Sequence, residues 1–558
     1  MSKFFTNPII ESGADPFVTK FAGKYYYCYS VGDGVNVSVA DKLYEVAPAK
    51  DGRAVYRAPK GCEYSCEYWA PELHRIDGRW YIYVAADDGD NINHRMYALG
   101  ALTDDPCGPY EMLGKIAVEP PYDKWAIDAT VLTIDRQNYF VWSGWSGDIN
   151  LQQNLYIAKM KDGKTLEGQR SLISCPELDW EMRSCGHGAP TINEGPAALY
   201  HDGKTFIVYS GSGSWSDDYC LGLLEFKGGD PLDPLSWEKH TEPILTASEG
   251  AWGPGHCSFT TSPDGSEDYV VYHANRVSGT SWGGRSVRIQ KIDWVDGLPV
   301  IGSPVKPGVE LPVPSENAPK IDTIIFDLDG TLVPIDQHEF TSEYLRLLGE
   351  KMASFGFEPK QAIDTIWKGC FAMSDNDGSV MNSEAFYRST REVYGDRTEE
   401  FLRILTEFYD TDFDKARSTV KTELIENGNF NAAPIVKALK EKGYTLALAT
   451  NPVFPLKALE VRLSWVGLTL DDFALITNYE NSRFCKPNPR YFEDIIFTLG
   501  KSADSCLMIG NNIAEDMSAS KVGIACLLLT DFLENRKGDD VDAFEHCELV
   551  ELPQKLGL

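Results

Sequence analysis

The chain has 558 residues, of which 43% are hydrophobic and 24% charged, and this size predicts two to four soluble domains. Its net charge of −31 argues against nucleic acid or an anionic membrane surface as a partner. Neither a bilayer-spanning apolar run nor a secretory leader is evident, so we expect a cytoplasmic protein whose thirteen cysteines are reduced.

Residues 1–303 repeat one local pattern, which reads as a strand, a tight turn and a second strand rich in aromatic residues. The five copies lie roughly 60 residues apart. They are Phe17 to Tyr29, Pro71 to Val84, Ala129 to Trp142, Glu194 to Tyr209 and Ser258 to His273. Turns such as Asp202-Gly203 between apolar runs are a strong hairpin signal. Strand-only repeats with one hairpin each favour an all-β five-bladed β-propeller over a solenoid.

Four copies have an acidic residue or a histidine seven to nine residues before the turn. These residues are Asp15, Asp128, Glu194 and His256. Corresponding positions of every propeller blade face one central axis, so we expect the four side chains to converge. Three carboxylates in one channel repel one another and lose hydration, which indicates a functional site.

Several other side chains of this region have two interpretations. Trp69 and Trp252 stand at the start of copies and could stack on a sugar ring, although packing in the core is the commoner role. His187 could lie near Glu194 or in a plain loop. Residues 87–90 bear a faint similarity to a cation-binding loop and are expected to form a solvated turn.

Residues 304–320 contain five prolines and predict an extended, fairly stiff linker. The pattern then changes, because a short apolar strand at 321–326 is followed by amphipathic helices to about residue 440. Further apolar strands alternate with helices beyond that point, at 445–449, 474–477, 505–509 and 525–529. The region 321–558 therefore predicts an α/β doubly wound (Rossmann-like) domain with a parallel sheet.

Acids around a channel suit hydrolysis of a glycosidic bond, in which one acid protonates the leaving oxygen and another deprotonates water. The segments that carry them resemble glycoside hydrolase family 43 over residues 5–305. The motifs are Ala14 to Phe17, Trp69 to Glu72, Trp125 to Ala129, Asn193 to Pro196 and Arg288 to Trp294. That family consists of five-bladed propellers with inverting activity, mostly α-L-arabinofuranosidases, β-xylosidases and arabinanases. The resemblance implies release of a pentose, foremost α-L-arabinofuranose, from an oligosaccharide substrate.

By this resemblance Asp15 is the general base and Glu194 the general acid, while Asp128 raises the pKa of the acid and orients it. Inversion predicts that the carboxyl groups of Asp15 and Glu194 lie about 6.5–9.5 Å apart. We expect exo action, since a cytoplasmic enzyme meets imported oligosaccharides rather than polymer. The alternatives are a β-xylosidase and a carbohydrate-binding propeller without hydrolysis.

The first region also contains candidates for contact with substrate or with a metal ion. Trp69 is the candidate for stacking on the sugar. By resemblance, Arg288 contacts substrate, with Arg285 as its rival. His256 corresponds to a histidine of the central channel that holds Ca²⁺ or water.

Asp327 and Asp329 indicate a second chemistry, because they follow the apolar strand at the start of the second region. Residues i and i+2 share one face of a strand, so both carboxylates point the same way. The carboxyl ends of strands in a doubly wound sheet border the ligand crevice. Two carboxylates there suit Mg²⁺ and phosphate, and a nucleophilic aspartate beside a second acid is typical of aspartyl-phosphate chemistry.

Together with residues 448–452, 486–489 and 509–516, this strand end resembles the haloacid dehalogenase superfamily over residues 321–558. The resemblance implies a helical cap at about 334–432. It also implies a Mg²⁺-dependent, phosphatase-like domain that acts on a small phosphate ester. The implied roles are nucleophile for Asp327, acid–base for Asp329, phosphoryl binding for Thr450, Asn451 and Lys486, and metal binding for Asp327, Asp329, Asn512 and Asp516.

The last of these motifs departs from the family pattern. An acid usually follows its glycine closely, but Asn511 and Asn512 stand there. An asparagine carbonyl binds Mg²⁺ with less charge than a carboxylate, so an inactive domain is the alternative. Neither region specifies an oligomeric state.

Overall fold

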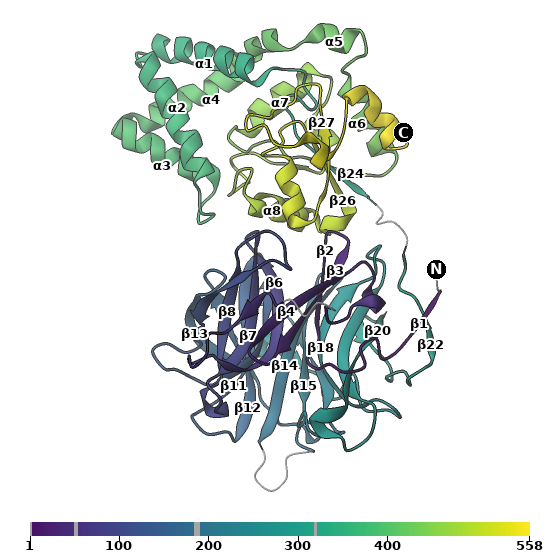
Figure 1. The fold of residues 1–558 in the computed structure, drawn as a ribbon. Coiled ribbons are helices and arrows are strands. Elements are labelled where there is room, and N and C mark those ends of the chain that lie inside the picture. The colour runs from purple at the N-terminus through teal and green to yellow at the C-terminus, as the bar shows by residue number, and fades with distance from the viewer. Residues whose placement is uncertain (1–2, 50–53, 184–189, 317–320) are drawn as a thin grey trace. The chain divides into compact units, whose positions relative to one another are not determined.

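The computed structural model describes residues 3–49, 54–183, 190–316 and 321–558 (Figure 1). The chain divides into two units, Met1–Pro319 and Lys320–Leu558. In the described part of the chain, no helix is long and apolar enough to cross a membrane.

The first unit is built from antiparallel sets of four consecutive strands. The first sheet contains β2 (Phe17–Phe21), β3 (Lys24–Val31), β4 (Gly34–Ala40) and β5 (Tyr56–Arg57), and the second contains β6 (Cys66–Ile76), β7 (Arg79–Asp87), β8 (Arg95–Ala101) and β9 (Tyr110–Lys115). An eight-stranded sheet follows, with β10 (Ala126–Ile134), β11 (Gln137–Trp145), β12 (Gln152–Met160), β13 (Leu166–Ser174), β14 (Thr191–His201), β15 (Lys204–Gly211), β16 (Cys220–Phe226) and β17 (Trp237–Lys239). Its two halves join through a short parallel pairing of β12 with β14.

The last four-stranded sheet contains β18 (Trp252–Thr261), β19 (Asp268–Asn275), β20 (Arg285–Val295) and β21 (Leu298–Val300). A separate pair joins the two ends of the unit, because β1 (Phe4–Thr6) is antiparallel to β22 (Glu310–Pro312). The unit is therefore held closed by backbone hydrogen bonds between residues about 300 positions apart.

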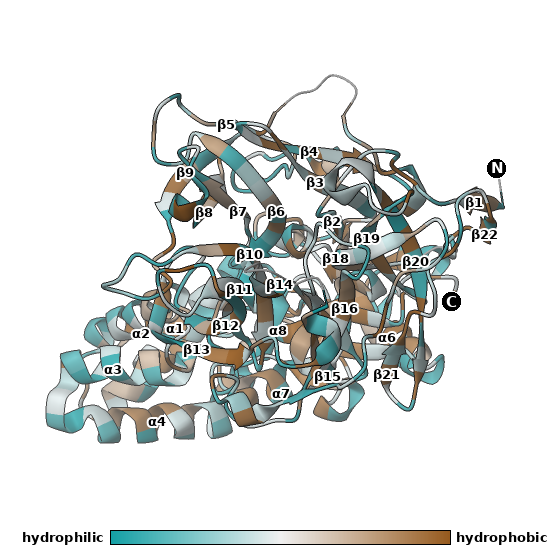
Figure 2. Ribbon diagram, turned by 90° about the horizontal axis from the view of Figure 1, so that it is seen from below, coloured by the Kyte–Doolittle hydropathy of each residue, from teal (hydrophilic) through white to brown (hydrophobic). Residues whose placement is uncertain are grey.

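The inner strands β2, β6, β10, β14 and β18 lie around a common centre. β2 contacts β6, which contacts β10, and the series continues through β14 and β18 back to β2. Figure 2 shows these strands near the centre and outer strands such as β5 and β9 at the periphery. Large side chains fill the space between sheets, and Trp80, Trp142 and Tyr209 are at most 2% exposed. The candidate acids lie on these inner strands or just before them, and therefore face a shared central region.

The turn predicted at Asp202-Gly203 is confirmed. These residues join β14 to β15 with φ values of 45° and 75°, and His201 pairs with Lys204 directly across the strands. A two-residue hairpin whose twist matches its strands needs a positive φ at both turn residues, which aspartate and glycine tolerate.

The second unit contains a six-stranded sheet in which every neighbouring pair is parallel, in the order β25-β24-β23-β26-β27-β28. The strands are β23 (Thr323–Phe326), β24 (Thr445–Leu448), β25 (Leu475–Ile476), β26 (Cys506–Gly510), β27 (Ala525–Leu529) and β28 (Glu545–Cys547). The central strands are nearly continuous apolar runs, as expected where both faces of a parallel sheet are covered. The sequence pattern missed β28, which has only three residues.

Four long helices follow β23 and form a group of their own in Figure 1. They are α1 (Gln337–Ser354), α2 (Pro359–Ser374), α3 (Asn382–Tyr394) and α4 (Thr398–Thr411). Asp336 caps α1, because its side chain accepts hydrogen bonds from the N–H groups of His338 and Glu339. The rings of Tyr344 in α1 and Phe408 in α4 pack with their centroids 6.0 Å apart. The remaining helices are α5 (Thr422–Glu426), α6 (Ala432–Glu441), α7 (Leu456–Trp465), α8 (Pro489–Leu499) and α9 (Leu552–Lys555).

Candidate active sites

Three of the four candidate residues of the central channel have a strained backbone on or just before the inner strands. Asp15, Asp128 and His256 have φ values of 46°, 52° and 43°. Aspartate and histidine tolerate this left-handed region better than most residues, but holding one there still costs on the order of 1–3 kcal/mol. The register of β10 shifts between Ile127 and Thr130, so Asp128 lies in a bulge that re-aims its side chain. Ala70 in β6 has a similar φ of 42° beside a register shift of its own, so this irregularity is shared by inner strands with and without a functional side chain.

The structure brings the predicted residues of the channel together. Nδ1 of His256 lies 3.4 Å from Oδ1 of Asp15 and 3.8 Å from Oδ2 of Asp128. The N–H of Gly195, directly after Glu194, donates a hydrogen bond to Oδ2 of Asp128 at 3.2 Å. Residues from β10, β14 and β18 and from the segment just before β2 therefore share one cluster.

Two side chains that the sequence did not single out connect Glu194 with Asp15. The hydroxyl of Tyr219 donates a hydrogen bond to Oε1 of Glu194 at 2.9 Å. The ring of Tyr219 stacks on that of His273, with the centroids 5.8 Å apart. Nδ1 of His273 in turn accepts the backbone N–H of Asp15 at 3.1 Å. A signal for His273 exists in the sequence, since it ends the fifth copy of the repeat, but Tyr219 carries none.

The same cluster shifts the pKa values of its two main acids in opposite directions. Burial acts to raise the pKa of Asp15, but the positive charges of His256 and Arg285 outweigh it and hold this pKa well below its usual range. Burial raises the pKa of Glu194 to about 7, with the hydrogen bond from Tyr219 lowering it and the charge of Asp15 raising it. At neutral pH the cluster therefore offers one ionised carboxylate beside one that is partly protonated.

Two further groups of the cluster are driven toward their neutral forms. Burial and the charge of Glu194 raise the pKa of Asp128 well above its usual range. Glu72, part of the Trp69 to Glu72 motif, adds to this increase. Burial lowers the pKa of His273 to about 4, which agrees with its Nδ1 acting as an acceptor. The net negative charge of the site is thereby concentrated on Asp15.

The arginine beside the cluster is Arg285. Its Nη1 lies 3.5 Å from Oδ1 of Asp15. Arg288 is fully buried, and its guanidinium donates to the backbone carbonyls of Val305 at 3.1 Å and Gly250 at 2.6 Å. Residues an odd number of positions apart on a strand face opposite sides, so only one of the two arginines can face the acids. The structure therefore does not support the substrate contact predicted for Arg288, and favours Arg285 for this role.

The predicted sugar-stacking residue Trp69 has one face already covered. Its ring stacks on that of His94, with the centroids 3.8 Å apart. Trp69 is half-buried, as is Trp252 at the start of β18. His187 lies outside the described residues.

Trp282, which the sequence did not single out, contacts Ser214, a neighbour of Glu194. Ser214 lies close enough to Glu194 for its hydroxyl to lower the pKa of this acid. Nε1 of Trp282 donates to Oγ of Ser214 at 3.2 Å, and the Trp282 side chain is 58% exposed. The ring of Trp215 meets that of Trp282 edge-on at 6.3 Å. An exposed aromatic pair beside an acid is a suitable surface for a sugar ring.

The environment of His256 does not fit the predicted calcium site. Within the described ranges, two groups of three side chains have ligand atoms close enough to share a metal ion, and neither contains His256. Calcium prefers six to eight oxygen ligands, whereas Nδ1 of His256 faces the carboxylates of Asp15 and Asp128. These contacts fit a histidine that orders two carboxylates.

In the second unit, Lys486 bridges two acids at the carboxyl ends of strands. Its Nζ lies 2.9 Å from Oδ1 of Asp327, which follows β23, and 2.6 Å from Oδ1 of Asp516, which follows β26. The N–H of Asn512 donates to the other oxygen of Asp516 at 2.9 Å. The side chains of Lys486 and Asp516 are only 1% exposed. The residues predicted for one crevice therefore meet at one edge of the sheet.

Asp329 forms a buried ion pair that the sequence did not reveal. Its Oδ2 lies 2.5 Å from Nη1 of Arg462 in α7, and Arg462 is fully buried. The guanidinium of Arg462 lies 4.5 Å from the ring centroid of Phe454. Burial raises the pKa of Asp329, although the charge of Arg462 acts to lower it. The predicted acid–base residue is therefore held in one position by a cation.

Thr450 and Asn451 follow β24 at the same edge of the sheet. The backbone oxygen of Thr450 accepts hydrogen bonds from the hydroxyls of Thr477 at 3.0 Å and Tyr491 at 2.8 Å. Nδ2 of Asn451 donates to Oε2 of Glu515 at 3.1 Å. Asn451 is thereby tied to the residue directly before Asp516.

The side chains of Asn511 and Asn512 are engaged with the protein itself. Oδ1 of Asn511 accepts the hydroxyl of Thr331 at 3.0 Å. Oδ1 of Asn512 accepts the backbone N–H groups of Ala514 at 3.1 Å and Glu515 at 3.0 Å. This carbonyl caps the turn that follows, so the structure does not support the metal-ligand role predicted for Asn512.

The acids that remain fit a Mg²⁺ ion. Burial raises the pKa of Asp516 to about 7, with Lys486 lowering it and the charge of Asp327 raising it. One lysine cannot neutralise both carboxylates. Magnesium takes one or two carboxylates together with phosphate oxygens and water, and Asp327 and Asp516 offer such a pair.

Two family models match the chain. One described as "Glycosyl hydrolases family 43" matches residues 5–299, and one described as "haloacid dehalogenase-like hydrolase" matches residues 321–523. The crystal structure of α-L-arabinofuranosidase from Lactobacillus brevis is similar to this chain, with a TM-score of 0.50 and a sequence identity of 34%. That match covers 55% of this chain and 98% of the other.

Curated proteins similar to the two regions are also known. The extracellular exo-α-(1→5)-L-arabinofuranosidase of Streptomyces avermitilis is 36% identical over 319 residues, which cover 55% of this chain and 64% of that protein. The phosphoglycolate phosphatase of Mesorhizobium japonicum is 26% identical over 201 residues, which cover 36% of this chain and 79% of that protein.

The matched part of this chain thus spans less than two thirds of the length of the Streptomyces relative. The first family match nevertheless covers more than half of this chain, and the second lies in the other unit. The chain belongs to glycosyl hydrolases family 43, and a haloacid dehalogenase-like hydrolase domain follows the family 43 region along the sequence.

Proposed function

We propose that the first unit is an inverting glycoside hydrolase that releases terminal α-L-arabinofuranose from oligosaccharides. The observation that carries this proposal is the opposite displacement of two pKa values within one cluster, low for Asp15 and about 7 for Glu194. Environments that push two acids apart in this way are typical of acid–base pairs. The names of the arabinofuranosidase relatives support the choice of sugar and of exo action.

In the proposed reaction, Glu194 gives its proton to the leaving glycosidic oxygen while Asp15 takes a proton from the attacking water. His256 and Arg285 keep Asp15 ionised through their charges, and the N–H of Gly195 fixes Asp128 beside the acid. Water attacks the face opposite the leaving group, so the product sugar has the inverted anomeric configuration. Trp282 is a second candidate surface for the sugar, in addition to Trp69.

We also propose that the first unit is a five-bladed propeller within residues 1–303, followed by a linker at 304–320. The closed series of contacts among the five inner strands supports this arrangement. The parallel strand order of residues 321–558 supports a doubly wound, Rossmann-like domain, with the helical group after β23 as its cap. The cytoplasmic location stays a prediction.

The glycosidase proposal is tested with p-nitrophenyl α-L-arabinofuranoside as substrate. Wild type should release p-nitrophenol. Because this leaving group needs little protonation, Glu194→Gln is compared with wild type on an arabino-oligosaccharide, on which it should lose at least about a hundredfold in rate. Proton NMR of the first product should detect the inverted anomer. Equal, near-zero rates for both proteins together with sugar binding would instead support a carbohydrate-binding propeller. A higher rate on p-nitrophenyl β-D-xylopyranoside would support the β-xylosidase alternative.

We propose a Mg²⁺-dependent phosphatase activity for the second unit, acting on a small phosphate ester. Asp327 would attack phosphorus, Asp329 would give a proton to the leaving oxygen, and Thr450 and Lys486 would hold the phosphoryl group. Mg²⁺ held by Asp327 and Asp516 would neutralise charge on the phosphate. The neighbourhood of Asp327, Lys486 and Asp516 supports this role.

Phosphate release from p-nitrophenyl phosphate tests this second activity. Wild type should need Mg²⁺ and should lose its activity in the presence of EDTA. Asp327→Asn should be inactive, while Asn512→Ala should retain most of the rate if its side chain only caps a turn. Absence of turnover on every phosphate ester tried would support an inactive domain.

A further inference from the structure

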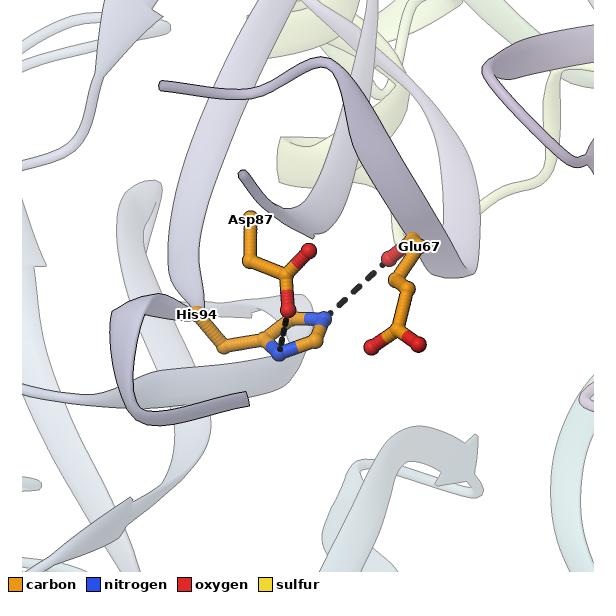
Figure 3. A group of neighbouring side chains, drawn as sticks. All are labelled: Glu67, Asp87 and His94. Atoms are coloured by element: carbon orange, nitrogen blue, oxygen red, sulfur yellow. Dashed lines mark hydrogen bonds and ion pairs between the residues drawn. The ribbon is translucent and has the colours of Figure 1, made fainter. Parts of the chain in front are cut away.

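Three potential metal ligands meet beside Trp69, outside the acid cluster of the first unit. Figure 3 shows Glu67 from β6, Asp87 from the end of β7 and His94 from just before β8. One ligand atom of each lies within 4.8 Å of the others. Asp87 and His94 are fully buried, whereas the side chain of Glu67 is exposed. The group therefore has a buried pair of ligands and one that opens toward solvent.

The hydrogen bonds of His94 determine which of its nitrogens is available. Nε2 lies 3.1 Å from the backbone oxygen of Glu67, as the dashed line in Figure 3 marks. A carbonyl oxygen only accepts, so Nε2 must carry a proton. In the neutral ring, Nδ1 then has a free lone pair. A histidine that donates one N–H to a backbone carbonyl and presents its other nitrogen is typical of a metal ligand.

The free lone pair of His94 faces a carboxylate oxygen. Nδ1 lies 3.0 Å from Oδ2 of Asp87. Within the described ranges, neither of these buried atoms has a hydrogen-bond partner, so the pair is close without the alignment of a hydrogen bond. The other oxygen of Asp87 is occupied by the N–H of Gly89 at 2.8 Å. Two buried acceptors this close need either a second proton on His94 or a metal ion to compensate them, and the missing hydrogen-bond alignment favours the metal ion.

The separation of these two atoms suits a shared metal ion. Ligands about 2.1 Å from a tetrahedral Zn²⁺ lie about 3.4 Å apart, so the two atoms, which are 3.0 Å apart, would have to separate by only a few tenths of an ångström to bind it. No lysine or arginine in the described part of the chain forms an ion pair with Glu67 or Asp87. A divalent ion would neutralise the charges of both carboxylates, and an imidazole nitrogen favours Zn²⁺ over Mg²⁺ or Ca²⁺.

A second group of potential ligands provides a contrast. Glu225, Glu238 and His240 are also close together. Nζ of Lys227 lies 3.2 Å from Glu225 and 3.1 Å from Glu238, and Lys204 lies 3.2 Å from Glu225. Lysines already compensate these carboxylates, so this group is a surface ion-pair network.

We propose that Glu67, Asp87 and His94 bind one divalent metal ion of the Zn²⁺ class with a structural role. The ion would join β6, β7 and the segment before β8. It would fix the ring of His94 against Trp69, with the centroids 3.8 Å apart. It would also fix the segment of Asn91, whose backbone oxygen accepts Nε1 of Trp125 at 2.7 Å. Residues 87–90, expected from sequence to be a solvated turn, contribute a buried metal ligand in this proposal.

The test measures Zn²⁺ bound to the full-length protein. The chain is stripped with EDTA, dialysed against Zn²⁺, and assayed for metal per chain by mass spectrometry. We expect Asp87→Asn to bind one Zn²⁺ fewer than wild type. Glu238→Gln makes the matching change in the lysine-compensated group and should bind as much as wild type. Asp327→Asn reports separately on any metal held by the second unit.

A second variant covers the case in which Asp87→Asn fails to fold. Glu67 is exposed, so Glu67→Gln should fold. Its affinity for Zn²⁺, measured by competition with a chelator, should fall by at least about tenfold. The rise in Tm on adding Zn²⁺ should shrink with it. Equal metal content and equal affinity in wild type and both variants would overturn the proposal and leave Asp87 and His94 as an ion pair only.

Discussion

The hydroxyl of Tyr219 donates a hydrogen bond to the carboxylate of Glu194 at 2.9 Å, and both side chains are buried. This bond lowers the pKa of Glu194, against the burial that raises it. The pKa of about 7 therefore results from opposing effects, and the hydroxyl of Tyr219, the residue directly before β16, contributes to it.

We expect Tyr219→Phe to raise the pKa of Glu194, because the bond to the ionised carboxylate is lost while the ring stacked on His273 stays. The alkaline limb of the rate profile for arabinofuranoside hydrolysis should move to higher pH. Tyr209→Phe is the matched control, since that hydroxyl donates to Glu181 at 2.9 Å, away from the acid cluster. An unchanged alkaline limb in Tyr219→Phe would contradict this account.

The two shifted pKa values predict the pH dependence of kcat/KM. Glu194 must be protonated to act, so the rate should be full below its pKa and fall as the pH rises through about 7. Asp15 must be ionised, and because its pKa is lowered, the rate should fall only at strongly acidic pH. A rate profile measured from pH 3 to 9 should therefore show the alkaline limb alone, and an acidic limb near pH 4 would mean that Asp15 keeps its ordinary pKa. A rate that rises between pH 7 and 9 would reverse the assignment of Glu194.

The raised pKa of Glu194 also predicts how stability depends on pH. The folded state binds this proton more tightly than the unfolded state, so the contribution to stability is full below about pH 4.5 and is lost as the pH rises to about 7. Glu194→Gln removes the titration, which is worth up to about 3 kcal/mol. As the pH rises from 4.5 to 7, the Tm of wild type should therefore fall relative to the Tm of Glu194→Gln. A constant difference would show that Glu194 keeps its ordinary pKa.

Arg285 and Arg288 should separate activity from stability. Arg285→Gln removes a charge 3.5 Å from Asp15, so the acidic limb should move to higher pH and kcat/KM should fall on the order of tenfold. Arg288→Gln should instead lower stability by about 1–3 kcal/mol, because two backbone carbonyls lose their donor. Its kcat/KM per folded molecule should match wild type. The reverse outcome would restore the assignment of Arg288 as the substrate contact.

In the second unit, we expect Arg462→Met to destabilise the fold by about 3–5 kcal/mol, because Asp329 is left buried without its cation. Loss of that charge should also raise the pKa of Asp329 further. Thermal unfolding should show the effect in the transition of this unit. Arg462→Lys keeps the charge and should recover most of the lost stability. Equal Tm values for wild type and Arg462→Met would mean that the ion pair of Arg462 with Asp329 does not stabilise the folded state.

Local chemistry explains what the sequence predicted correctly. The turn at Asp202-Gly203 follows from two residues that tolerate positive φ, and the strand before Asp327 follows from three adjacent apolar residues, Ile324 to Phe326. These features depend on neighbours only a few positions away. The resemblance to the haloacid dehalogenase superfamily, carried by the motifs that contain Asp327, Lys486 and Asp516, indicated these three residues as one site.

The sequence by itself determined the repeated hairpins of the first region, the parallel strands of the second and the acids that each presents. The tertiary structure alone decided which arginine faces Asp15, which phenol contacts Glu194, and which cation holds Asp329. It also brought Glu67, Asp87 and His94 together. These contacts join residues from different strands and helices, and no local pattern encodes them. They depend on how whole sheets pack, and packing is a property of the folded chain rather than of any segment.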